Sequence, residues 1–71
     1  MMIVVNLQWD EEANVYFATS NDMTGLALES ESCENLIKRC QMVVPELLKL
    51  NNELPNDEKI LLRFIFECEL N

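Results

Sequence analysis

The sequence predicts an α+β domain in which three β-strands, one α-helix and a fourth strand follow one another, with the helix packed on one face of an antiparallel sheet. Apolar residues recur at helical spacing only in the stretch 32–52, whereas the flanking segments alternate apolar and polar residues as half-buried strands do. The 71 residues suffice for one small domain, and a hydrophobic content of 49% is enough for a core. We therefore expect a single domain over residues 1–71.

The first two expected strands, 2–9 and 15–19, should form an antiparallel hairpin, because only the short polar stretch 10–14 separates them. In the first strand the odd positions from Ile3 to Trp9 face one way, and the residues between them face the other. In the second strand Val15 and Phe17 face one side of the sheet, and Tyr16 and Ala18 face the other.

A polar turn over residues 20–25 precedes a short third strand over 26–29. The turn contains Gly25, the only glycine of the chain, which adopts positive φ without steric cost. The loop that starts at Ser30 then leads into the helix.

The helix is the element around which the chain is organised. Ser32 can cap its start, and Glu34 in the first turn suits the positive end of the helix dipole. Pro45 allows two outcomes, a kinked continuous helix or a break near Val44 followed by a second short helical turn. The apolar stripe that should face the sheet consists of Cys33, Leu36, Ile37, Cys40, Val43, Val44, Leu47 and Leu48.

The last expected strand is the longest and spans residues 58–70. Every second residue from Ile60 to Leu70 is apolar, and the opposite face carries Arg63, Glu67 and Glu69. That opposite face is only partly polar, because it also includes Leu61 and Ile65.

These two residues predict a second, smaller apolar surface on the side of the sheet that the helix does not cover. We expect it to comprise Val4, Tyr16, Ala18, Leu61 and Ile65. An antiparallel sheet with one wetted face has no need of apolar residues on both faces, so the surface predicts an intermolecular contact. The alternative is that these are ordinary exposed apolar residues. The predicted contact residues are Tyr16, Leu61, Arg63 and Ile65.

The formal net charge of −8 weighs against direct binding of nucleic acid, because phosphate contacts need clustered lysine and arginine. Only five basic residues are present, and they are scattered along the chain. Such an acidic domain is suited to a basic protein partner. The charge also has a simpler interpretation, which is solubility.

Three cysteines and no histidine give no recognisable metal motif, and we expect neither a metal nor a cofactor. Cys33 and Cys40 fall on the apolar stripe of the helix, and Cys68 continues the apolar alternation of the last strand, so we interpret all three as small hydrophobic residues. The chain has neither a basic signal-peptide start nor an apolar run of membrane-spanning length, and we expect a cytoplasmic protein that does not contact membranes.

The order of these elements and several of their loop residues resemble the HicB-like antitoxin group, and more closely a related family of short prokaryotic proteins of unassigned function. The resemblance covers about the first fifty residues, and the final strand fits by position only. Thr24 stands where the family most often has proline. The segments that carry the resemblance are 10–13, 15–20, 22–26 and 44–51, together with Ser32, Glu34 and Leu36.

The resemblance implies a partial double-stranded-RNA-binding-type fold that does not bind RNA. In HicB-like antitoxins this domain covers a small basic mRNA-cleaving toxin of the HicA type. Those antitoxins usually add a ribbon-helix-helix or helix-turn-helix segment that binds DNA, and we expect no such C-terminal segment here. The absence of histidine argues against a toxin, since the toxin's cleavage chemistry resembles one that relies on histidine.

Three hypotheses follow for the function. The first is a non-catalytic, antitoxin-like interaction module that also forms a homodimer or higher oligomer. The second is a stand-alone homo-oligomer with a structural or regulatory role. The third is an enzyme built on the carboxylates of Asp10, Glu11, Glu12 and Asp22, which we disfavour because acidic residues in surface turns are usually only solvated.

Overall fold

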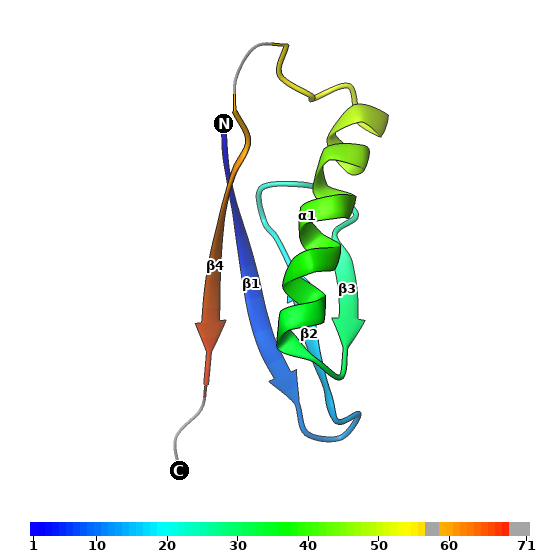
Figure 1. Cartoon of the computed structure of the whole chain (residues 1–71), viewed down its shortest axis with the longest axis vertical. Helices are drawn as coiled ribbons and strands as arrows, with labels where there is room; N and C mark the ends of the chain where they lie inside the picture. The colour runs from blue at the N-terminus through cyan, green and yellow to red at the C-terminus, as the bar shows by residue number, and fades with distance from the viewer. Residues whose placement is uncertain (57–58, 69–71) are drawn as a thin grey trace.

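The computed structural model describes residues 1–56 and 59–68, and within them the predicted order of elements is confirmed (Figure 1). The expected ends of the last strand, at residue 58 and at 69–70, lie outside the described residues. The elements are β1 (Met2–Asp10), β2 (Val15–Thr19), β3 (Ala27–Ser30), α1 (Cys33–Leu50) and β4 (Leu61–Glu67).

The sheet has the strand order β3-β2-β1-β4 and is mixed rather than antiparallel throughout. β1 pairs antiparallel with β2, and β2 pairs antiparallel with β3, whereas β4 runs parallel to β1. The reason is the single helix, which returns the chain to the end of the sheet where β1 begins (Figure 1). A strand that starts there must run in the same direction as β1.

The tight β1–β2 loop fixes which side chains of the hairpin face the helix. Asp10 closes the loop, since its Oδ1 accepts hydrogen bonds from the amides of Glu12 and Ala13 at 3.0 and 3.2 Å. Asn14 adopts the left-handed conformation with φ of 55°, which asparagine tolerates better than most residues. The resulting register places Leu7 opposite Ala18 and Trp9 opposite Tyr16.

β1 extends beyond the end of β2, and polar side chains of the following turn take over its hydrogen bonding. The Val4 amide donates to Oδ2 of Asp22 at 2.7 Å, and the Ser20 hydroxyl donates to the Val4 carbonyl at 2.6 Å. Gly25 ends the turn with φ of +91°, as the sequence predicts. The connection between β2 and β3 also supplies two core residues, because Met23 and Leu26 are buried.

α1 is continuous through Pro45, so the predicted alternative of a break at Val44 is wrong. Its start is capped as expected, with the Ser32 hydroxyl accepting from the Asn35 amide at 3.2 Å. At its end the amide of Asn51 donates to the Leu47 carbonyl at 2.9 Å. No helix among the described residues is long and apolar enough to cross a membrane.

The core lies between α1 and one face of the sheet. The fully buried helix residues Leu36, Cys40, Val44 and Leu48 are spaced by four, and thus form one stripe along the helix. The sheet contributes buried Ile3, Val5, Leu7 and Ala18. α1 lies closest to β2 and β3, and β4 lies at the opposite edge of the sheet (Figure 1).

We predict that Leu48→Ala destabilises the domain by about 2–5 kcal/mol, because it removes buried methyl groups and leaves a cavity. Leu50, two residues further on, is 80% exposed, and Leu50→Ala should change the free energy of unfolding by less than about 0.5 kcal/mol. Urea denaturation followed by circular dichroism measures both. Equal effects of the two substitutions would contradict the assignment of the buried stripe.

Candidate interaction surface

β4 is an edge strand that carries apolar residues on both of its faces. Leu62 and Phe64 pack from the helix side against the core. On the reverse face Leu61 is 54% exposed and Ile65 is 41% exposed. Phe66, again on the helix side, is 48% exposed and lies near the end of β4, at the edge of the sheet farthest from the strands that α1 covers. Exposed apolar side chains on both faces of an edge strand are typical of a contact with another chain.

The backbone of β4 is also available at its outer edge. The Leu61 amide donates to the Met1 carbonyl at 2.8 Å, so the backbone groups of Leu61 point toward β1. Because these groups alternate in direction along a strand, those of Leu62, Phe64 and Phe66 point away from the sheet. No strand or helix of the described chain lies along this edge.

The opposite edge of the sheet, β3, is protected. It is only four residues long, and the Arg39 side chain from α1 donates to the Glu29 carbonyl at 2.6 Å. Asn35 of α1 also donates to the Ser30 hydroxyl at 3.2 Å. Short edges covered by polar side chains resist pairing with another chain, so the two edges differ in what they can bind.

The predicted position of Tyr16 and Ala18 on the reverse face is wrong. The hairpin register places them beside Trp9 and Leu7 on the helix side, where Ala18 is fully buried and Tyr16 packs against the core. Alternation alone could not show this, because both sets of β2 contain one aromatic residue. Of the four predicted contact residues, the structure brings together Leu61, Arg63 and Ile65 and places Tyr16 on the other face.

The reverse face is apolar at the end where β1 and β4 begin. The register puts Met2 beside Leu61 and Val4 beside Arg63. Met2 is 44% exposed, so the patch formed by Met2, Val4, Leu61 and Ile65 is accessible. We call it the reverse-face patch. The remainder of this face is more polar, with Asn6 next to Ile65 and to Thr19.

A shallow groove runs between α1 and β4 on the helix side. It has an open volume of about 340 Å³ and its lining includes Val44, Pro45, Ile60, Leu62 and Phe64. Pro45 supplies an apolar wall and has no amide proton of its own. Sequence reasoning missed this groove, since it depends on how far the helix reaches across the sheet.

An aromatic row continues from the groove along the helix-side face. The rings of Trp9 and Tyr16 lie edge to face with centroids 4.7 Å apart, and those of Tyr16 and Phe66 are 5.9 Å apart. Such pairs are typical of stabilising aromatic contacts. Trp9 remains 41% exposed, so the row is not fully covered.

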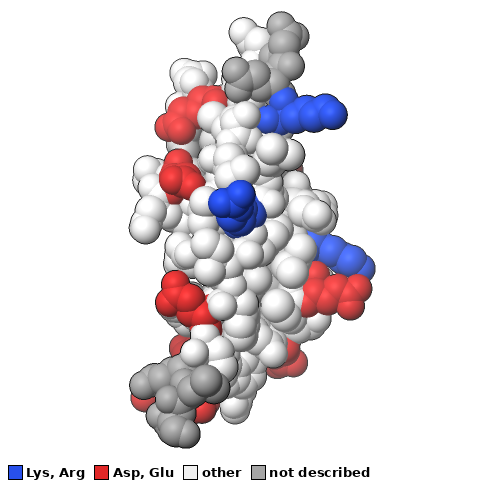
Figure 2. All heavy atoms as spheres, turned by 90° about the vertical axis from the view of Figure 1, so that its left-hand side faces the viewer, with Lys and Arg blue, Asp and Glu red and all other residues white. Residues whose placement is uncertain are grey.

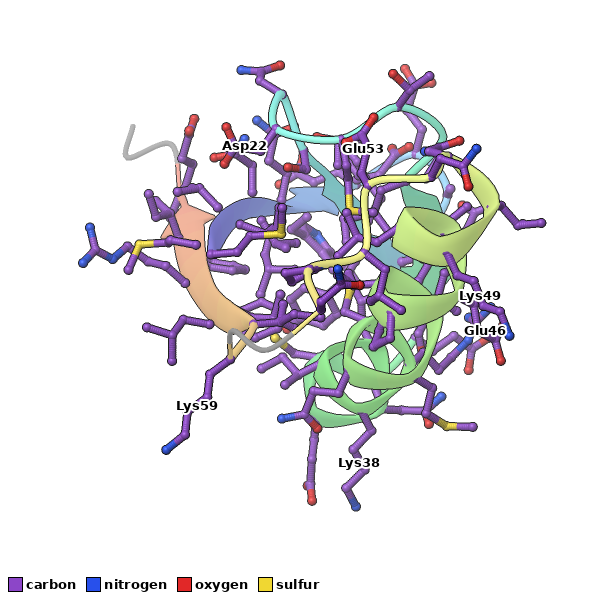
Figure 3. All side chains as sticks on the ribbon, turned by 90° about the horizontal axis from the view of Figure 1, so that it is seen from above. Asp22, Lys38, Glu46, Lys49, Glu53 and Lys59 are labelled. Carbon is purple, nitrogen blue, oxygen red and sulfur yellow. The ribbon has the colours of Figure 1, made fainter. Side chains whose placement is uncertain are left out.

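The view onto the β4 edge shows a largely uncharged surface with a few basic and acidic side chains, mostly toward its margins (Figure 2). Seen from above, Lys38, Glu46 and Lys49 point outward from α1, and Lys59 points outward near the start of β4 (Figure 3). The charges of these side chains therefore lie outside the space between helix and sheet.

Two of the four carboxylates considered for catalysis, Asp10 and Asp22, have structural partners. Asp10 accepts from loop amides, and Asp22 accepts from the Val4 amide. No group of three or more metal-ligating side chains is found in the part of the chain that the structure describes. The geometry thus gives these residues a role in the turns.

The fold and this surface define a class, namely a small α+β domain in which one helix of the described chain covers a sheet whose edge strand β4 has no strand paired to its outer side within the described residues. The sequence matches the family described as "Domain of unknown function (DUF1902)" over residues 2–69, and the chain belongs to that family. The expected relation to a family of unassigned function is thereby confirmed.

The structure is similar to the crystal structure of hypothetical protein TTHA1013 from the extremely thermophilic bacterium Thermus thermophilus. The two share 34% sequence identity with a TM-score of 0.88, and the match covers 100% of this chain and 99% of the other. No curated protein matches the chain.

The cysteines should differ sharply in reactivity. Burial raises the pKa of the Cys40 thiol, with Arg39 partly opposing the shift, whereas Cys68 is exposed. Because the thiolate is the reactive form, we predict that a thiol reagent at pH 8 labels Cys68 quickly and Cys40 only after unfolding.

Mass spectrometry of labelled peptides, with and without urea, measures this difference. Cys40→Ser identifies the slow site. Equal labelling rates of Cys40 and Cys68 in the native protein would contradict the buried position of Cys40.

Proposed function

We propose that this protein is a non-catalytic, HicB-like interaction module that binds and masks a small basic toxin of the HicA type. The observation that carries the proposal is the open side of β4, with the reverse-face patch accessible on a sheet that one helix covers from the other side. Nothing in the arrangement of the acidic turn residues requires catalysis.

Charge supports a basic partner. The chain has a formal net charge of −8, and an acidic surface attracts a basic protein before contact is made. The apolar residues of the reverse-face patch would then supply the desolvated centre that a specific interface needs. Fast association driven by charge and slow dissociation from an apolar contact are the two properties that a masking protein needs.

The resemblance to HicB-like antitoxins supports the same function through the order β-β-β-α-β and the turn residues described above. Such a module acts in the cytoplasm, where its mRNA-cleaving partner would be made. It needs no contact with nucleic acid or membrane, and no cofactor or metal.

A second candidate function is a stand-alone homo-oligomer with a structural or regulatory role. The observation in its favour is the unpaired seven-residue edge of β4, which a second copy can extend without any other partner.

The test of toxin masking is co-expression with the product of an adjacent reading frame that encodes a short, basic, histidine-containing protein. We expect the two proteins to co-elute in gel filtration and the growth arrest caused by the partner alone to be relieved. Absence of a complex at micromolar concentrations would overturn the proposal.

The contact residues are tested by Leu61→Asp, which should weaken the complex at least about tenfold by burying a charge in the reverse-face patch. Met42→Asp is the matched control, because Met42 is a 70% exposed apolar residue of α1. Its complex should retain wild-type affinity within about threefold. Equal effects of the two changes, measured by calorimetry, would show that the partner binds elsewhere.

A further inference from the structure

We infer that a second copy of this chain pairs antiparallel with β4 along its outer edge, in a register whose two-fold axis passes through Ile65. The inference stands apart from toxin masking, because it concerns the chain alone. It rests on the direction of the backbone groups, the order of charged and apolar residues in β4, and the distribution of charge over the whole chain.

The backbone restricts the possible registers. In an antiparallel pair, outward-pointing groups on one strand must meet outward-pointing groups on the other. Here they belong to Leu62, Phe64 and Phe66, so an even-numbered residue must face an even-numbered one. The two-fold axis therefore passes through a residue and not between two residues.

The side chains discriminate among the remaining registers. An axis through Arg63 sets two guanidinium groups directly opposite each other, which is unfavourable. An axis through Phe64 places Arg63 against Ile65 and Glu67 against Leu61 of the second copy. An axis through Phe66 also opposes an apolar residue to a carboxylate, namely Ile65 to Glu67.

Of the four registers compared, an axis through Ile65 is the one that pairs residues 63–67 of β4 with complementary residues of the second copy. It places Arg63 opposite Glu67 of the second copy, and by symmetry this ion pair forms twice. Ile65 faces its own counterpart between the two ion pairs on the reverse face. On the helix side Phe64 meets Phe66 of the second copy, at the mouth of the groove lined by Val44 and Pro45.

The overall charge also favours this edge. Two chains of net charge −8 repel each other, and the contact is least opposed where acidic residues are fewest. Within β4 itself, Leu61–Glu67, one basic residue, Arg63, stands against one acidic residue, Glu67, so the strand has no net charge.

A charge exchange tests the register. Arg63→Glu and Glu67→Arg should each weaken the dimer about tenfold or more in sedimentation equilibrium, because each change sets two like-charged pairs opposite each other. The double variant restores both pairs and should return the dissociation constant to within about threefold of the wild type. Lys38→Glu is the control for net charge, since Lys38 lies on the outer surface of α1.

The inference is overturned if the wild-type chain remains monomeric at millimolar concentration. It is also overturned if the double variant dimerises no better than the single variants. Circular dichroism confirms that each variant is folded before it is compared.

Cysteine cross-linking tests the axis directly, in a Cys68→Ser background. Opposed residues of a non-hydrogen-bonded pair have Cα atoms about 4.5 Å apart, within the range that a disulfide spans. Ile65→Cys should therefore give a covalent dimer on mild oxidation. In Arg63→Cys the two thiols stand four positions apart along the strands, about 13 Å, and should not cross-link. Cross-linking at 63 and not at 65, or at neither position, would overturn the register.

Discussion

The structure depends on the limited width of one helix. An α-helix with its side chains is about 10–12 Å across, whereas neighbouring strands are about 4.8 Å apart. One helix thus covers two to three strands, and this sheet has four. α1 lies over β2 and β3, and its stripe from Leu36 to Leu48 packs in one core with Ile3, Val5 and Leu7 of β1. β4 falls at the margin, which leaves Phe66 exposed on the helix side. Leu61 and Ile65 are exposed on the reverse face, which α1 does not cover.

The same constraint explains why the two edges of the sheet differ. β3 lies close enough to α1 for Arg39 to reach the Glu29 carbonyl, and this contact covers a strand of only four residues. β4 is nearly twice as long and is too far from the helix for a comparable contact. A small domain gains little stability from its own core, so burial of this strand against another chain would add usefully to it. Toxin masking and self-association both make use of this property of the fold.

Much of the fold could be predicted from the sequence because its signals are local. The 3.6-residue period placed the helix, Ser32 marked its start, and alternation placed each strand to within two or three residues. The direction of β4 could not be predicted, because it depends on the path of the chain after α1. The side of the sheet on which Tyr16 lies could not be predicted either, because it follows from the loop between Asp10 and Asn14 and not from any pattern within β2. The exposed apolar residues Leu61 and Ile65 on the reverse face of β4 could be predicted from the sequence, whereas the groove beside Pro45 could be found only in the structure.

Amide hydrogen exchange of the purified protein tests most directly whether another chain covers the outer edge of β4. The amides of Arg63 and Ile65 point toward β1 and should be protected in any folded state, whereas those of Phe64 and Phe66 point outward. We predict that the amides of Phe64 and Phe66 are protected as well, and that their protection declines on dilution. Rapid exchange of both amides at every concentration, beside protected neighbours, would contradict it.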